Sequence, residues 1–156
     1  IEAFSDFQCP YCATFYRSLV ELRRKYPEHI AITYRNYPLF IHPFARGTAI
    51  AALCAADQGK FDQFHSHAFE HQHSIPFIRW TDIAATLGVN SASFEACLGD
   101  SSVSQRVRED SLDAKRLGVT GTPTVLVNQW RLFGTPTTAM LDSIVLSVMP
   151  KSAEQR

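Results

Sequence analysis

The sequence predicts an α/β protein in which helices flank a central mixed sheet and an all-helical block is inserted between the two sheet-forming parts. Three observations support this prediction. Residues 1–37 have a β-α-β pattern, a long stretch with helical periodicity follows, and a β-hairpin pattern with one more helix comes near the end. A β-α-β unit forms a parallel strand pair and a hairpin forms an antiparallel pair, so the sheet is expected to contain both.

The first part of the chain changes period twice. Residues 1–4 are a short apolar run that predicts a strand, and residues 30–37 alternate between apolar and polar side chains, as a half-buried strand does. Between them, apolar residues recur at helical spacing as far as Pro27, which ends the predicted helix. These residues therefore predict a β-α-β unit.

The remaining elements follow in order. Residues 43–57 are apolar almost all round, as in a buried helix, and several shorter helices that end at glycines are predicted after them. Residues 125–133 predict a hairpin with its turn at 128–129, and residues 135–148 predict a last helix. The polar tail, residues 151–156, is expected to fray.

The composition is that of an ordinary globular protein. Apolar residues make up 46% of the 156 residues and charged residues 19%, and fifteen basic side chains balance fifteen acidic ones. Nucleic acids and anionic membranes require a basic face, so neither is expected as the main partner. We expect one domain over residues 1–156, and a processed or trimmed start, because the chain begins inside a predicted strand.

The most specific chemical feature is the sequence Cys9-Pro10-Tyr11-Cys12, where the first strand gives way to the first helix. If Cys9 caps this helix, its sulfur faces unpaired N–H groups and the positive end of the helix dipole. Both stabilise a thiolate, and Pro10 suits the first helical position. The pair predicts a thiol–disulfide exchange site, with Pro10 and Tyr11 tuning its redox properties.

A metal site is the weaker interpretation, and we predict none. A structural zinc site usually has four ligands, and the sequence contains no second Cys-x-x-Cys pair. Four histidines (His65, His67, His71 and His73) cluster in the middle of the chain, and two of them share a helix face. Solvated histidines on the polar side of an amphipathic helix explain this cluster more simply than a metal ion does.

Two motifs far apart in the chain match one known family. They are Phe-Ser-Asp-Phe-Gln-Cys-Pro-Tyr-Cys (residues 4–12) and Gly-Thr-Pro-Thr-Val-Leu-Val (residues 121–127). Together with the order of elements, they resemble the DsbA-like thiol:disulfide oxidoreductases, whose thioredoxin fold carries a helical insertion. The resemblance covers nearly the whole chain, and it implies thioredoxin-fold halves at 1–39 and 119–150 and an insertion at 40–118. Glutaredoxins share Cys-Pro-Tyr-Cys but are much shorter and lack the insertion.

The resemblance also implies roles for individual residues. Cys9 is expected to be the exposed nucleophile and Cys12 its buried resolving partner. Pro123 is expected to follow a cis peptide bond and to face the disulfide, with Thr122 before it. An extended substrate segment could bind at this loop as an added strand.

Two features lie outside the shared motifs. Relatives often carry a buried glutamate six residues before the first cysteine, but this chain has Ala3 there, and strand alternation should turn Glu2 to the opposite face. The resemblance therefore supplies no proton acceptor for Cys12. Cys54 and Cys97 are either two buried small hydrophobic residues or, as in some relatives, a structural disulfide.

We therefore expect a protein-disulfide oxidoreductase that exchanges disulfides with cysteines of protein substrates, more readily as an oxidase of secreted proteins than as a reductase. No cofactor is expected, only a membrane-bound or soluble redox partner. The expected location is periplasmic or otherwise extracytoplasmic, with the cytoplasm as the alternative. The oligomeric state is left open.

Other functions fit parts of the sequence. One is a module that holds unfolded proteins and uses the disulfide structurally. The aromatic residues Phe7, Tyr11, Phe40 and Phe44 could form its apolar surface, although they could equally belong to the core. Another is a glutathione-dependent isomerase or transferase of the same fold, but such relatives usually have serine in place of Cys9.

Overall fold

A four-stranded mixed sheet organises the protein, whose computed structural model describes residues 1–128 and 130–149. The strands lie in the order β2-β1-β3-β4. Strand β1 is parallel to β2 and antiparallel to β3, and β3 is antiparallel to β4, so the predicted mixed sheet is confirmed. The strands are β1 (Glu2–Ser5), β2 (Thr33–Asn36), β3 (Thr124–Val127) and β4 (Trp130–Phe133).

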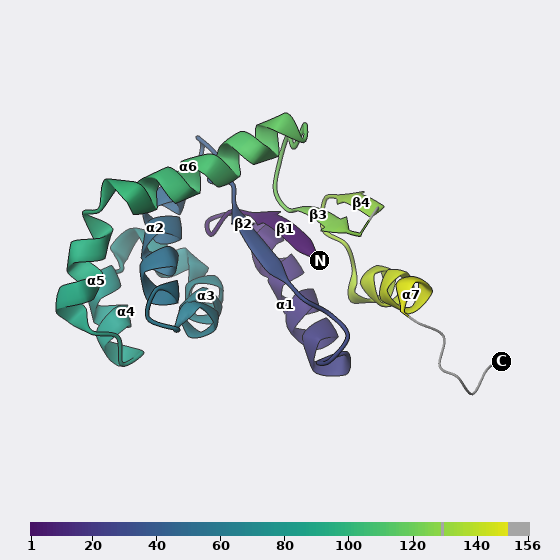
Figure 1. Ribbon diagram of the computed structural model, residues 1–156, viewed down its shortest axis with the longest axis horizontal. Helices are drawn as coiled ribbons and strands as arrows, with labels where there is room; N and C mark the ends of the chain where they lie inside the picture. The colour runs from purple at the N-terminus through teal and green to yellow at the C-terminus, as the bar shows by residue number, and fades with distance from the viewer. Residues whose placement is uncertain (129, 150–156) are drawn as a thin grey trace.

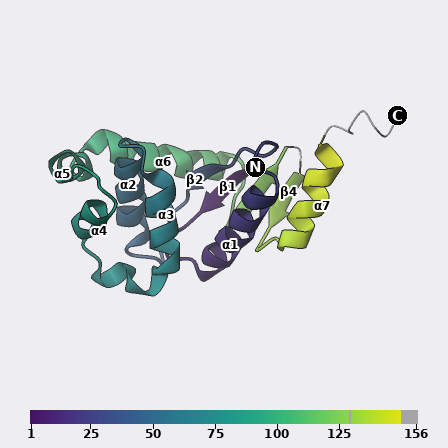
Figure 2. The ribbon, with the colours of Figure 1, turned by 90° about the horizontal axis from the view of Figure 1, so that it is seen from below.

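Helices cover both faces of this sheet (Figures 1 and 2). Helices α1 (Pro10–Lys25) and α7 (Thr138–Val148) lie on one face, and α6 (Ser101–Arg116) crosses the other. Alternation along β1 divides its side chains between the two sides, because successive residues of a strand point to opposite faces. Ala3 packs with α1 and α7. Phe4 packs with apolar residues of α6 and of the segment that follows α6.

A block of helices separates β2 from β3 in the sequence and lies to one side of the sheet, at the left of Figure 1. Helix α2 contacts α3, α5 and α6, which explains why its sequence is apolar almost all round. Within residues 1–128 and 130–149, no helix has the length and apolar character needed to cross a bilayer. Before α6, the block contains α2 (Ala45–Ala56), α3 (Phe61–Glu70), the 3-10 helix η1 (Gln72–Phe77), α4 (Trp80–Thr86) and α5 (Ser91–Leu98).

Several element boundaries differ from the sequence-based expectation. The strand predicted at 30–37 is only Thr33–Asn36, because its partner β1 offers just four residues for pairing. Helix α7 begins at Thr138 rather than at 135, since the side chain of Thr137 caps it and accepts a hydrogen bond from the Met140 N–H at 3.2 Å. Part of the predicted turn at 128–129, the last residue of the predicted half 119–150, and the tail 151–156 lie outside the described residues.

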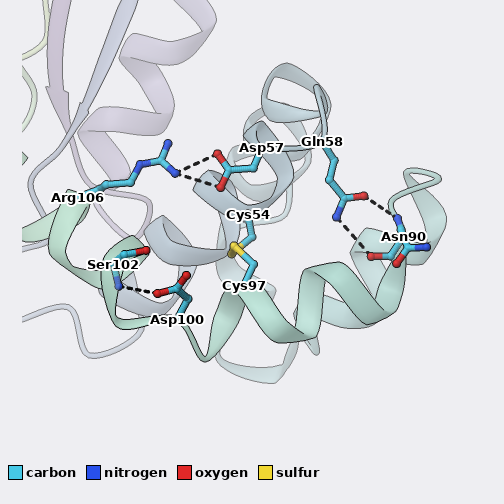
Figure 3. The surroundings of a disulfide bond; sticks show 8 residues. All are labelled: Cys54, Asp57, Gln58, Asn90, Cys97, Asp100, Ser102 and Arg106. Carbon is cyan, nitrogen blue, oxygen red and sulfur yellow. Dashed lines mark hydrogen bonds and ion pairs between the residues drawn. A yellow bond between two sulfur atoms is a disulfide. The ribbon is translucent and has the colours of Figure 1, made fainter.

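A disulfide joins Cys54 of α2 to Cys97 of α5, with the two Cα atoms 5.7 Å apart (Figure 3). The alternative of two unpaired buried thiols is therefore wrong. Polar contacts surround the bond. The Arg106 guanidinium lies 2.9 Å from Asp57, and Gln58 exchanges two hydrogen bonds with the backbone of Asn90. The disulfide therefore staples two helices of the block at a point where other contacts already align them.

Removing this disulfide should destabilise the protein. The bond closes a sequence separation of 43 residues, so the double variant Cys54→Ala/Cys97→Ala should lose about 4 kcal/mol of unfolding free energy on the chain-entropy model. Urea unfolding measures this loss. In a Cys9→Ser/Cys12→Ser protein only the Cys54–Cys97 bond can be reduced, so a reductant should cause a similar loss there. An unchanged unfolding midpoint in both experiments would show that the staple does not stabilise the fold.

Candidate active site

Cys9 is the N-cap residue of α1 and Pro10 is the first residue of that helix, as the sequence predicted. The Cys9 N–H donates to the Asp6 carbonyl at 3.1 Å, and the Cys9 carbonyl accepts from the N–H groups of Cys12 and Ala13 at 3.0 and 3.2 Å. No side-chain hydrogen bond caps the helix. The first N–H groups of α1 are thus left to interact with a negative charge on the Cys9 sulfur.

The two cysteines of the motif have opposite proton affinities. A hydrogen bond from the Cys12 side chain is the main cause that lowers the pKa of Cys9 to about 5, and Thr122 and the N–H groups at the start of α1 contribute further, against the effect of burial. Burial raises the pKa of Cys12, which is 1% exposed. In the reduced pair, the negative charge therefore resides on Cys9 and the proton on Cys12.

Cys9 is less exposed than the family resemblance implied. Only 4% of its surface is accessible, whereas its neighbour Tyr11 is 66% exposed. The Thr122 carbonyl accepts a hydrogen bond from the Cys9 thiol at 3.3 Å, and the Gln72 side chain bonds the Cys9 carbonyl, so the residue is approached from two sides. The expectation of a freely exposed nucleophile is wrong for this form, in which both thiols are free.

The loop before β3 lies against the cysteine motif, although the two are far apart in the sequence. Pairing of β1 with β3 brings it there, and the peptide bond between Thr122 and Pro123 is cis. The Thr122 hydroxyl oxygen is buried, and the described residues provide it with no hydrogen-bond partner in the geometry of the free thiols. A thiolate on Cys9 is an acceptor close at hand, in agreement with the contribution of Thr122 to the lowered Cys9 pKa.

The carboxylate of Asp6 is a site feature that the sequence did not single out. Asp6 is 1% exposed, and its two oxygens accept hydrogen bonds from the N–H groups of Gln8 and Leu39, both at 2.7 Å. The second oxygen also lies 2.8 Å from Nδ1 of His42. Meanwhile the Asp6 N–H donates to the Cys12 sulfur at 3.4 Å. Asp6 thus joins the motif to the loop after β2; its place at a strand end just before the cysteines was the only signal in the sequence.

Gln72 was also missed. Its Nε2 donates to the carbonyls of Phe7 and Cys9, at 2.8 and 2.9 Å, and so clamps the backbone on both sides of Gln8. Gln72 belongs to η1 in the helical block, 63 residues from Cys9. A glutamine in a polar stretch carries no pattern that would have indicated this contact.

Glu2 faces away from the cysteines, as strand alternation predicted. Its carboxylate lies 3.3 Å from Nε of Arg35, and the position of the family's glutamate is filled by the fully buried methyl group of Ala3. The groups that oppose the rise in the Cys12 pKa are the Ser5 side chain and the Asp6 N–H. Any proton exchange at Cys12 must therefore use a route different from the one that the relatives suggest.

The histidines do not behave as one solvated cluster. The expectation is wrong for His65, which is 3% exposed and has Phe7, Tyr34 and other aromatic rings around it. Burial lowers the pKa of this imidazole to about 3. His67 and His71 stack with ring centroids 4.2 Å apart. In the part of the chain that the structure describes, no three His, Cys, Asp or Glu side chains gather where they could hold a metal ion.

The four aromatic residues proposed as an apolar surface divide into two groups. Phe7 is 5% exposed and stacks on Phe69 with centroids 5.0 Å apart, so it belongs to the core. Tyr11, Phe40 and Phe44 are 66, 99 and 44% exposed. Only these three can contact another molecule.

The sheet, the helical insertion and the two cysteines beside the Thr122–Pro123 loop define a protein with the thioredoxin fold. The chain belongs to the thioredoxin family, because the model of the family described as thioredoxin matches residues 1–145. The predicted family and fold are confirmed.

Solved structures share this fold over almost the whole chain. A thioredoxin-like oxidoreductase from Silicibacter pomeroyi DSS-3 has a TM-score of 0.80 and 23% identity, with 94% of this chain and 83% of that chain covered. The thiol-disulfide exchange protein alpha-DsbA2 from Wolbachia pipientis has a TM-score of 0.80 and 22% identity, with 95% of this chain and 80% of that chain covered. BdbD from Bacillus subtilis has a TM-score of 0.79 and 19% identity, with 94% of this chain and 84% of that chain covered. At these identities, the likeness establishes the fold.

Curated relatives are much longer proteins. The Na(+)/H(+) antiporter NhaA 1 of Salinispora arenicola is 32% identical over 145 residues, which are 92% of this chain but 22% of the antiporter. The corresponding protein of Mycolicibacterium vanbaalenii is 31% identical over 131 residues, 80% of this chain and 21% of its own length. The chain thus spans about a fifth of these relatives.

The Cys9 pKa should depend on the donor at Cys12. We expect the ultraviolet absorbance of the thiolate in the reduced protein to rise as pH increases through about 5. In Cys12→Ala, which lacks the largest cause of the lowering, the rise should move toward the free-cysteine value of about 8.5. Cys12→Ser is the matched control, because its hydroxyl keeps a donor and should keep a lowered pKa. A Cys12→Ala titration that coincides with that of the wild type would contradict the assignment.

Gln72→Ala should loosen the start of α1. Two partly buried carbonyls lose their donor, so the free energy of unfolding should fall by about 2 kcal/mol, and amide exchange at the start of α1 should become faster. Gln58→Ala is the control, because Gln58 also makes two side-chain hydrogen bonds to backbone, but at the exposed site around Asn90. Equal exchange at the start of α1 in both variants would show that Gln72 does not hold this backbone.

Proposed function

We propose that this protein is a thiol:disulfide oxidoreductase that oxidises cysteines of protein substrates through Cys9 and Cys12. The observation that carries the proposal is the stabilised Cys9 thiolate beside a buried, protonated Cys12. A sulfur with a low pKa is a good leaving group, and a stabilised reduced form makes the corresponding disulfide a stronger oxidant. The structural neighbour from Wolbachia pipientis that is named as a thiol-disulfide exchange protein supports the same activity.

The reaction begins with a disulfide between Cys9 and Cys12. A substrate thiolate attacks the Cys9 sulfur, a bond forms between these two sulfurs, and the electron pair of the broken bond goes to the Cys12 sulfur, which takes up a proton. A second substrate thiolate then attacks the substrate sulfur of this mixed disulfide and releases Cys9 as a thiolate. The substrate has lost two electrons to the protein and has gained a disulfide.

Thr122 and Pro123 are proposed to bind the substrate backbone in this reaction. Their loop lies against Cys9, and an extended segment that adds itself beside it would place its own cysteine near the reactive sulfur. Tyr11, which is 66% exposed next to Cys9, offers an apolar contact to the same segment.

The proposed setting is periplasmic or otherwise extracytoplasmic, with a membrane-bound or soluble redox partner that reoxidises Cys9 and Cys12. The disulfide between Cys54 and Cys97 supports this setting, because such bonds persist in oxidising compartments. We retain the division into thioredoxin-fold halves at 1–39 and 119–150 around an insertion at 40–118 as a proposal. The proposed function does not include cation–proton antiport, because the matched segment is only about a fifth of those antiporters.

One alternative keeps an observation of its own. The exposed side chains of Tyr11, Phe40 and Phe44 would also suit a module that holds unfolded proteins without exchanging disulfides. Such a module would keep its activity in Cys9→Ser, whereas the proposed oxidase would lose disulfide transfer altogether.

The reduction potential of the Cys9–Cys12 pair tests the direction of electron flow. Equilibration with glutathione buffers should give a value closer to the roughly −120 mV of DsbA than to the roughly −270 mV of thioredoxin. The physical reason is the stabilised Cys9 thiolate. Cys12→Ser cannot serve as a control, because it has no Cys9–Cys12 disulfide to reduce, but Cys54→Ala/Cys97→Ala should leave the value unchanged. A potential near that of thioredoxin would overturn the oxidase proposal in favour of a reductase.

A further inference from the structure

A groove lies between the loop that follows β2 and helix α6, next to the cysteine motif but not part of it. It has a volume of about 610 Å³. The loop supplies one wall, and residues of α6 at helical spacing supply the other. The lining residues that matter here are Leu39, Phe40, Arg46, Arg108, Leu112 and Lys115.

The groove is positively charged although the whole chain has no net charge. Arg46, Arg108 and Lys115 line it, and none of its described lining residues is acidic. Within residues 1–128 and 130–149, none of these three cations has an acidic partner, whereas Arg106 on the same helix is paired with Asp57 at 2.9 Å. The positive charge is therefore local. Arg46 donates a hydrogen bond to the Ser104 hydroxyl oxygen at 2.7 Å, which leaves its charge unneutralised.

The three carboxylates of α6 do not line the groove. Glu109 accepts a hydrogen bond from the Gln105 side chain at 3.3 Å. Asp110 lies 3.0 Å from Nε of Arg35 and accepts a hydrogen bond from the Asn36 N–H at 2.9 Å. Asp113 pairs with Arg35 and, at 2.9 Å, with Arg116. The contacts of these two acids are thus with β2 and the end of α6, and neither neutralises the groove.

The same groove presents apolar surface. Phe40 is 99% exposed and Leu112 is 36% exposed, while Val107 at 1% forms a closed floor. A fully exposed phenylalanine beside three unpaired cations is suited to a ligand that has both apolar and acidic side chains.

The loop that carries Phe40 is held in place by the residues just before Cys9. The N–H of Leu39 and Nδ1 of His42 both contact Oδ2 of Asp6, at 2.7 and 2.8 Å, and the Phe44 N–H donates to Oε1 of Gln8 at 2.6 Å. The groove wall is therefore preorganised, so a ligand loses little affinity to ordering it. The same bonds tie the groove wall to the segment that leads directly into Cys9.

We propose that this groove docks an acidic, apolar segment of the protein substrate. Carboxylates of the segment pair with Arg46, Arg108 and Lys115, and a large apolar side chain packs on Phe40 and Leu112. This inference rests on the proposed function and adds a substrate class to it: proteins in which acidic and apolar residues accompany the cysteine to be oxidised.

Binding of designed peptides tests the charge preference. Three fluorescent peptides of equal length share the same leucine and phenylalanine residues, have serine in place of cysteine, and differ in carrying glutamate, glutamine or lysine. Fluorescence anisotropy at low ionic strength should show that the glutamate peptide binds about tenfold more tightly than the glutamine peptide, with the preference fading as salt is added. Equal binding of the three peptides would overturn the proposal.

Charge reversal locates the site. Arg46→Glu/Arg108→Glu/Lys115→Glu should abolish the preference for the glutamate peptide, and Phe40→Ala should weaken binding of all three peptides. The matched control is Arg17→Glu/Arg24→Glu/Lys60→Glu, which changes the charge equally at cations outside the groove and should keep the preference. A preference that survives reversal within the groove would place the binding elsewhere and refute the inference.

Oxidation of a small dithiol separates this inference from the proposed function. Dithiothreitol has no side chains to dock, so the wild type and the Arg46→Glu/Arg108→Glu/Lys115→Glu variant should oxidise it at equal rates. If neither protein oxidises it, the proposed function fails. If both oxidise it but the glutamate peptide shows no preference for the wild type, the function stands and the groove proposal is wrong.

Discussion

The buried carboxylate of Asp6 is the constraint on which the surroundings of the cysteines depend. It satisfies the N–H groups of Gln8 and Leu39 and contacts His42, so a single side chain fixes both the approach to α1 and the loop after β2. A buried carboxylate without such partners would be strongly unfavourable. Because the partners are backbone groups of two different loops, satisfying the charge also sets the position of one loop relative to the other.

The chemistry that follows depends on a difference between two identical side chains. Cys9 lies at a helix start where donors converge, and Cys12 lies one turn deeper where burial excludes charge. The proton shared by the pair therefore has one preferred position. In the proposed reaction the same difference favours the reduced pair, because Cys12 holds the proton that it takes up and the thiolate finally released is the stabilised Cys9.

Features that depend on neighbouring residues could be predicted from the sequence, whereas contacts between distant residues could not. Short stretches of sequence were enough to predict the cap at Cys9 and the position of Pro10. The mixed sheet was predicted in the same way, from the apolar periodicity of each segment. The contact between Gln72 and Cys9 spans 63 residues, and nothing in either local sequence encodes it. His65 was misjudged because a histidine in a helix reads as polar, whereas here aromatic residues from several elements enclose it. The pairing of Cys54 with Cys97 stayed open because spacing alone gives no distance between helices.

The clamp made by Gln72 changes how the helical block should be regarded. The block is inserted between the two sheet-forming parts of the chain, yet it supplies a donor to the carbonyl of Cys9, the N-cap residue of α1. Part of what holds the backbone at Cys9 is therefore encoded in a segment far from Cys-Pro-Tyr-Cys in the sequence. A change in the helical block can therefore alter the backbone around Cys9 while the motif itself stays the same.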